Sequence, residues 1–178
     1  LKEPILYPLD LEGATPENYQ ELQDNLLNQF GKLDGLVHNA SILGTQMPIE
    51  QYDIKLWYST IQINLNAPFM LTQFLIPALL KSDDARIIFL SSTVGRKARA
   101  YWGAYSVSKF GIEGFAKTLS EELEKTQISV NTVNPGKLRT EMRRTAYPAE
   151  DSSTVPLPED KSQAIVHLLS SSSPKING

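Results

Sequence analysis

A tyrosine, a lysine and a serine in this chain have the types and spacing of an acid–base site. Lys109 follows Tyr105 by four residues, and Ser92 lies thirteen residues before the tyrosine. Residues four apart on a helix lie on the same face. A lysine ammonium about 5 Å from the phenol, at an effective dielectric of about 20, would favour the phenolate by roughly 3 kcal/mol. That lowers the tyrosine pKa by about two, from an ordinary value near ~10 towards the range of a general acid or base.

A strand and a helix must position these side chains. The apolar run at 87–90 predicts a buried strand, which places Ser92 at a carboxyl end, where open α/β sheets bind their ligands. A helix is expected at 104–125, and it would carry both Tyr105 and Lys109. The spacing alone is weak, because a core tyrosine and a surface lysine give the same pattern.

Apolar strands alternate with helical patterns along the rest of the chain. We also expect strands at 5–9, 33–37 and 128–133, and helices at 16–30, 53–80 and from 158 to about 169. Pro68 and Pro77 should kink the long helix rather than end it, and 135–157 is predicted as a loop. The alternation predicts βαβ units and a parallel sheet, that is, a doubly wound α/β fold in one domain over residues 1–178.

Composition excludes several classes of protein. A net charge of −3 without a basic run argues against a nucleic-acid binder. The absence of cysteine excludes a disulfide scaffold, an iron–sulfur cluster and a thiolate zinc site. His38 and His167 are far apart, and no cluster has metal-ligand spacing, so no metal is expected. The sequence contains no run of eighteen apolar residues, so no membrane-spanning helix is predicted, and a cytoplasmic protein is expected.

The segment around the tyrosine resembles the active-site segment of the short-chain dehydrogenase/reductase family. Gly95 and Gly103 separate the strand from the helix, and small residues fill the tyrosine–lysine motif. The resemblance extends over almost the whole chain, and stretches such as 102–110 are most similar to bacterial oxidoreductases without an assigned substrate. It implies a Rossmann-like, three-layer α/β/α fold.

The same resemblance implies a role for each residue of the site. Ser92 would hold the substrate oxygen, and Tyr105 would donate or accept the proton. Lys109 would lower the tyrosine pKa and bind the nicotinamide ribose. Asn64 would complete a proton relay through water, and its side chain can also deform its helix locally. The implied reaction is hydride transfer between NAD or NADP and a small-molecule carbonyl or alcohol. Apolar side chains expected to wall the substrate pocket are Tyr101, Trp102, Met142 and Tyr147.

Further motifs imply cofactor contacts. The family pattern Asn-Asn-Ala-Gly corresponds to 38–41, where Ser41 replaces a glycine whose backbone freedom a serine lacks. The pattern Pro-Gly-x-x-x-Thr corresponds to 135–140, where the Leu138 backbone would bind the nicotinamide amide. His38 is interpreted as a hydrogen-bonded structural residue. The implied cofactor-binding set is Asp10, Leu11, Asn39, Ala40, Ile63, Tyr105, Lys109, Pro135, Gly136, Leu138 and Thr140.

A glycine-rich phosphate loop, which the family places before the segment matching Asp10, does not occur in the sequence. Compared with the family, the chain begins in the third strand and ends before the seventh, so we expect a portion of a longer polypeptide. The choice between NAD and NADP stays open, because the second strand would carry the deciding residue. The expected strand at 5–9 would also have no neighbouring strand.

Two rival functions and one partner complete the expectations. An epimerase or dehydratase on the same scaffold would usually have a longer chain. A non-catalytic nucleotide-binding or interaction module could have lost its phosphate loop, and cofactor titration would separate it from an enzyme. The helix at 53–80 is apolar over most of its circumference, which predicts a homodimer or homotetramer through this helix and 104–125. The protomer's own loops are the alternative cover.

Overall fold

The sheet of the protein is parallel and has three strands in the part of the chain that the structure describes. The structure is a computed structural model that describes residues 4–170 and 174–178. Strands β1 (Gly35–His38), β2 (Ala85–Leu90) and β3 (Ile128–Val133) lie in that order, all parallel. A helix separates each strand from the next, as the alternation in the sequence predicts.

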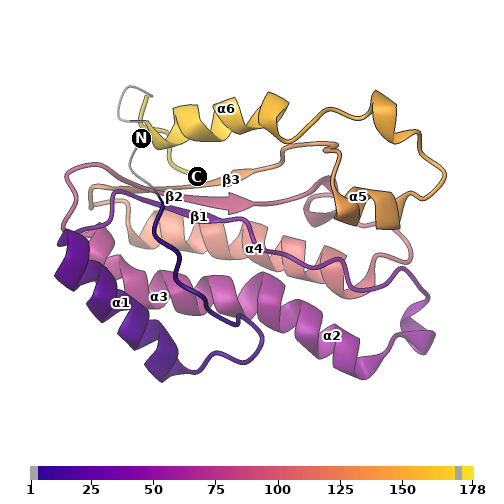
Figure 1. The fold of residues 1–178 in the computed structure, drawn as a ribbon, viewed down its shortest axis with the longest axis horizontal. Helices are drawn as coiled ribbons and strands as arrows, with labels where there is room; N and C mark the ends of the chain where they lie inside the picture. Colours follow the sequence, from indigo (N-terminus) through magenta and orange to yellow (C-terminus); the bar gives the residue numbers. More distant parts are fainter. Residues whose placement is uncertain (1–3, 171–173) are drawn as a thin grey trace.

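Helices cover both faces of the sheet (Figure 1). Four helices lie on one face: α1 (Pro16–Phe30), α2 (Ile54–Ile61), α3 (Ala67–Leu79) and α4 (Gly103–Glu122). Helix α6 (Glu159–Leu169) lies on the other face, and the short α5 (Glu141–Ala146) lies beyond the carboxyl ends of the strands. The predicted three-layer α/β/α architecture is confirmed. None of the helices in the described ranges is long and apolar enough to span a bilayer.

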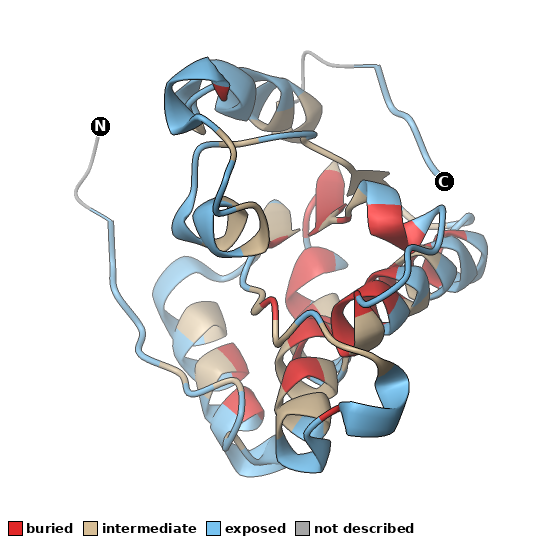
Figure 2. Ribbon diagram, turned by 90° about the vertical axis from the view of Figure 1, so that its right-hand side faces the viewer, coloured by how far each residue is buried: buried red, intermediate tan, exposed pale blue. Residues whose placement is uncertain are grey.

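The main core lies between the sheet and α4. Ile87 and Phe89 of β2 and Val130 of β3 are fully buried, and they pack with Ile112 and Leu119 of α4. Figure 2 shows the buried residues gathered around this layer, whereas α6 has none. Because α4 shares this core with β2 and packs closely along β3, the core fixes the helix that carries the tyrosine and the lysine.

The expected strand at 5–9 is wrong. This segment forms no strand, and its apolar side chains Ile5 and Leu6 are exposed. A strand is stabilised by ladder hydrogen bonds to a neighbour, and no strand of the described sheet pairs with this segment. The β-type pattern of residues is present, but the pairing is not.

The long helix expected at 53–80 is interrupted. A π turn over Gln62–Asn66 separates α2 from α3. Pro68 lies in the first turn of α3, just after the π turn, and Pro77 lies inside α3. A proline cannot donate the backbone bond that continues a helix, so the register shift falls where Pro68 would otherwise break the ladder. The loop expected at 135–157 contains the additional helix α5.

Candidate active site

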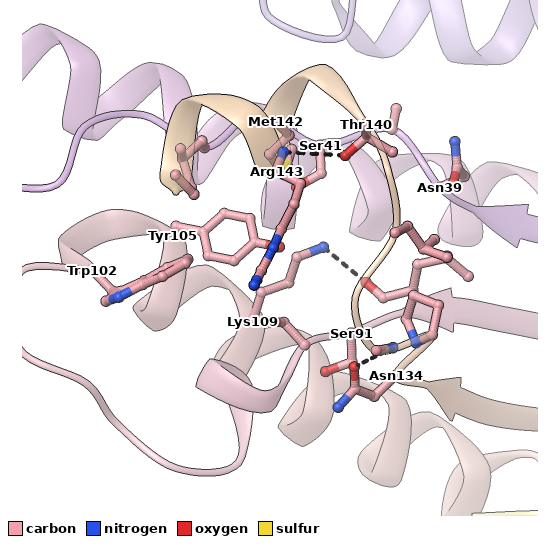
Figure 3. Close-up of a pocket in the computed structure, with 18 of the residues that line it drawn as sticks. Asn39, Ser41, Ser91, Trp102, Tyr105, Lys109, Asn134, Thr140, Met142 and Arg143 are labelled. Carbon is pink, nitrogen blue, oxygen red and sulfur yellow. Dashed lines mark hydrogen bonds between the residues drawn. The ribbon is translucent and has the colours of Figure 1, made fainter. Parts of the chain in front are cut away.

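The carboxyl ends of all three strands meet at one cavity of about 400 Å³ (Figure 3). Segments following β1, β2 and β3 contribute to its wall, and α4 and α5 complete it. It is lined by Asn39, Ala40, Ser41, Leu43, Leu90, Ser91, Ser92, Trp102, Tyr105, Lys109, Asn134, Pro135, Gly136, Leu138, Thr140, Met142, Arg143, Ala146 and Tyr147. The serine, tyrosine and lysine selected from the sequence are therefore brought together.

Lys109 is a buried lysine whose ammonium group is held by the backbone. Its Nζ donates a hydrogen bond of 2.8 Å to the carbonyl of Leu90, the last residue of β2. Burial lowers the pKa of Lys109 to about 8, because the charged form loses hydration. An ammonium has three donors, so one bond to Leu90 leaves two for a group in the cavity.

The Tyr105 hydroxyl is less acidic than the spacing predicts. Burial raises the tyrosine pKa above its ordinary value, and a side-chain hydrogen bond with Ser92 offsets part of that rise. The Lys109 ammonium lies 5.5 Å from the centre of the tyrosine ring. The predicted net lowering of the tyrosine pKa is thus wrong for this chain on its own, because desolvation of the phenol is the largest effect on it.

A close packing contact fixes Ser92 against α4. Ser92 precedes the 3₁₀ turn Thr93–Gly95. A Cβ at Gly95 would lie 2.9 Å from backbone atoms of Lys109, so only glycine lets the turn approach the helix this closely. Ser106 of α4 donates a 2.7 Å hydrogen bond to the Val94 carbonyl of the same turn. These contacts set the position of the serine relative to the tyrosine.

Asn64 lies behind the cavity rather than in its wall. Its Oδ1 accepts a hydrogen bond from the Ile42 amide at 2.8 Å, and its Nδ2 donates to the Ile42 carbonyl at 2.8 Å. Nδ2 also donates to the Ser108 hydroxyl of α4 at 3.2 Å. The side chain therefore ties the loop after β1 to α4, from within the π turn. The implied water relay stays a prediction.

The segments expected to bind the cofactor separate into two groups. Those at Asn39 and Ala40 and along 135–140 line the cavity, whereas Asp10, Leu11 and Ile63 do not. Asp10 is exposed, and its carboxylate accepts a 3.0 Å hydrogen bond from the amide of Glu12, closing a local turn. Their roles stay predictions.

The backbone tolerates serine at the position of the family glycine. Among the described residues other than glycine, Tyr101 alone has a positive φ, so Ser41 adopts no conformation that requires glycine. The Ser41 hydroxyl is buried, lines the cavity and has no hydrogen-bond partner among the described residues. Gly136, by contrast, has a φ of 74°, and its amide donates to the Asn134 side chain at 3.1 Å.

Comparison with known proteins places the chain. The short chain dehydrogenase family model matches residues 2–151. The chain belongs to the short-chain dehydrogenase family.

Several members of this family are similar over most of the chain. YciK, an uncharacterized oxidoreductase of Escherichia coli, is 43% identical over 159 residues, which are 89% of this chain and 63% of YciK. A 3-oxoacyl-[acyl-carrier-protein] reductase of Salmonella typhimurium is 33% identical over 136 residues, which are 76% of this chain and 55% of the reductase. The chain thus spans less than two thirds of these curated relatives.

Solved structures of short-chain dehydrogenases superpose closely. One from Pseudomonas syringae has a TM-score of 0.96 at 47% identity, and the match covers 98% of this chain and 71% of the Pseudomonas chain. One from Shigella flexneri, complexed with NADP, has a TM-score of 0.95 at 41% identity, covering 99% and 73%. These likenesses agree with the parallel sheet and the helix layers described above.

His38, which departs from the family pattern, is structural here. Its Nε2 lies 2.9 Å from the Thr72 hydroxyl, and that hydroxyl donates to the Pro68 carbonyl at 2.7 Å. The imidazole therefore donates from Nε2. The ring stacks on Phe89 with centroids 4.5 Å apart, and burial lowers the histidine pKa to about 3. It lies outside the cavity, and no group of His, Asp or Glu side chains in the described ranges is placed to hold a metal ion.

The outer wall of the cavity comes from α5. Trp102, Met142 and Tyr147 line the cavity as expected, whereas Tyr101 is exposed and does not line it. Arg143 also lines the cavity, and sequence reasoning missed it. The sequence feature that could have revealed α5 is Thr140 followed by Glu141, which is typical of a helix N-terminus. In the structure the Thr140 hydroxyl caps α5 by accepting a 3.2 Å hydrogen bond from the Arg143 amide.

Proposed function

We propose that this protein is an NAD(P)-dependent oxidoreductase that interconverts a carbonyl and an alcohol. The observation that carries the proposal is the convergence of Ser92, Tyr105 and Lys109 on one cavity at the carboxyl ends of parallel strands. Two hydroxyls and an ammonium can together bind and protonate a carbonyl oxygen. The relative from Shigella flexneri is complexed with NADP, so NADP is the cofactor to test first.

The residues present fit the nicotinamide end of such a cofactor. Lys109 keeps two donors beyond its bond to Leu90, which suits the hydroxyls of a ribose. The unpartnered Ser41 hydroxyl and the backbone along 135–138 offer further polar contacts in the same cavity. When bound, the nicotinamide would supply the hydride.

The protein's own groups would manage the proton. Because its pKa is raised, Tyr105 is protonated at neutral pH and starts as the proton donor to the carbonyl oxygen. Ser92, hydrogen-bonded to Tyr105, holds that oxygen beside the phenol. The nearby Lys109 ammonium then stabilises the phenolate that remains. Asn64 holds the wall through Ile42 and is a positioning residue in this scheme.

Isotope transfer tests the proposal. The full-length protein would be incubated with NADPH carrying deuterium at the transferable position and with a panel of aldehydes and ketones. The proposal predicts deuterium on the former carbonyl carbon, read by mass spectrometry. Tight cofactor binding without any deuterium transfer would instead favour a non-catalytic nucleotide-binding module.

Self-association and a cytoplasmic location belong to the same proposal. Phe69 of α3 and Val107 and Phe110 of α4 are exposed apolar side chains on the two helices expected to dimerise. Light scattering should find a dimer or tetramer of the full-length protein, and Phe110→Asp should release a folded monomer. Val166→Asp on α6, an exposed apolar position away from these helices, is the control. A wild-type monomer at micromolar concentration contradicts the idea. Fractionation of cells, which should place the protein with cytoplasmic markers, tests the location.

A further inference from the structure

The charged side chains that line the cavity are both basic. Lys109 and Arg143 are the basic residues among those that line it, and no aspartate or glutamate is among them. Lys109 is assigned above to the reacting end. Arg143 comes from α5 on the outer wall, and Figure 3 shows its side chain reaching into the cavity that Tyr105 and Lys109 line. A cleft lined by one sign of charge attracts the opposite sign.

The Arg143 guanidinium is held in a fixed plane. Its face packs on the Tyr147 ring, 3.6 Å from the ring centroid. Its Nε and Nη2 donate to the Glu150 carboxylate at 2.6 and 2.7 Å. That pair leaves the Nη1 donors outside the bidentate contact. Glu150 is also approached by Lys137 at 3.3 Å, and these cations lower its pKa to about 2, so it is ionised at neutral pH.

Tyr147 is supported from its other neighbours as well. The Arg99 Nη1 donates to the Tyr147 hydroxyl at 2.6 Å, and the Arg99 guanidinium lies 5.6 Å from the Tyr147 ring centroid. Trp102, beside Tyr105, packs with its ring centroid 5.9 Å from that of Tyr147. The aromatic rings thus form an ordered wall on which Arg143 rests. A preorganised guanidinium recognises a planar carboxylate with little loss of side-chain entropy.

We infer that Arg143 is a specificity-determining residue, which selects carbonyl substrates that carry a carboxylate. The inference rests on the proposed oxidoreductase function. The substrate carboxylate would bind Nη1, or replace Glu150 on the guanidinium, while the carbonyl lies between Ser92 and Tyr105. Glu150 acts in this view as an internal competitor that keeps the arginine oriented when no substrate is bound.

The competing interpretation is an ion pair that only fastens the segment around Glu150 to α5. The two interpretations differ for a matched pair of variants. Arg143→Gln and Glu150→Gln break the same ion pair, but only the first removes the cation. A structural pair predicts that both variants act alike, whereas carboxylate selection predicts that only Arg143→Gln loses the preference for a carboxylate.

The test compares two aldehydes of similar size, para-carboxybenzaldehyde and para-tolualdehyde, with the full-length protein and NADPH. The wild type should favour the carboxylate in kcat/KM. In Arg143→Gln that ratio should fall by about tenfold or more, as expected for a lost charge-assisted hydrogen bond, and in Glu150→Gln it should stay or rise. Taking the ratio cancels any general loss of activity. Equal changes of the ratio in both variants, or none in Arg143→Gln, overturn the inference.

A binding measurement separates this inference from the proposed function. Calorimetric titration with benzoate and with benzamide needs no turnover, and benzoate should bind the wild type more tightly. Arg143→Gln should lose that preference and Glu150→Gln should retain it. Equal binding of benzoate and benzamide by the wild type overturns the inference even if carbonyl reduction is established. Failure of deuterium transfer with the benzoate pattern intact would instead refute the reaction.

Discussion

Replacement of Lys109 by methionine should stabilise the protein at neutral pH while it removes activity. Burial lowers the pKa of this lysine from 10.5 to about 8, so the folded state disfavours the ammonium that the unfolded chain keeps. At about 1.4 kcal/mol for each pH unit, burial of the charge costs roughly 3 kcal/mol below pH 8. The lost hydrogen bond to Leu90 takes back about 1 kcal/mol, which leaves a net gain of about 2 kcal/mol for Lys109→Met.

The pH dependence gives this prediction its direction. Between pH 8 and 10.5 the unfolded lysine holds its proton and the folded one loses it, so wild-type stability rises with pH in that interval. The advantage of Lys109→Met should therefore be full below pH 8 and shrink as the pH rises to 10.5.

Urea denaturation of the full-length protein without cofactor, at a series of pH values, measures this difference. Lys117→Met, which changes an exposed lysine on the same helix, should show no such dependence. If Lys109→Met is destabilised at neutral pH, or if its difference from wild type does not change with pH, then the lysine is not held as a desolvated cation and the reasoning is refuted.

Three further substitutions test the supports of the site. Asn64→Ala removes the hydrogen bonds that tie the loop after β1 to α4, and it should destabilise the protein by roughly 2–4 kcal/mol in denaturant titration. The control Asn66→Ala, at an exposed position, should change stability by less than about 0.5 kcal/mol. Equal effects of the two substitutions would contradict the bracing role of Asn64. Gly95→Ala should destabilise by about 1–3 kcal/mol and lower turnover, because a Cβ there meets the backbone of α4. A Cβ at Gly114, also on α4, meets nothing within 4 Å, so Gly114→Ala should be neutral or stabilising; similar behaviour of the two variants would refute the close approach. His38 has a pKa of about 3 in the folded state and 6.5 in the unfolded state, so the stability of the protein should fall as the pH drops below 6.5. His38→Gln should remove most of that acid dependence in thermal melts. An unchanged pH profile would show that the imidazole is not buried in its neutral form.

Local sequence patterns predict those helices and strands whose formation depends mainly on their own residues. The helix predicted at 16–30 coincides with α1, whose start is set by Pro16 and whose end is set by Gly31 with a φ of 76°. The strand predicted at 87–90 lies inside β2, because a continuous apolar run suits a strand buried on both faces. The pattern at 5–9 failed, since strand formation depends on a neighbour that a single segment does not reveal.

In the candidate site, too, local sequence patterns predict the positions of residues but not the properties that depend on tertiary packing. The spacing of Ser92, Tyr105 and Lys109 predicts their convergence, because strand ends and helix faces follow from local structure. The electrostatics were not predictable from spacing, since the burial that raises the pKa of Tyr105 and lowers that of Lys109 depends on the packing of distant segments. Arg143 was missed for a related reason, as α5 lies within a stretch whose proline, serine and charge content suggest a loop.

Substitution of the proposed proton donor tests the central claim most directly. Tyr105→Phe in the full-length protein keeps the packed ring and removes only the hydroxyl. The account predicts that carbonyl reduction with NADPH falls by about 10²–10⁴-fold, while cofactor affinity, measured by fluorescence titration, stays within about twofold of wild type. Retained turnover, or loss of cofactor binding with residual turnover, would remove Tyr105 from the catalytic role and contradict the account.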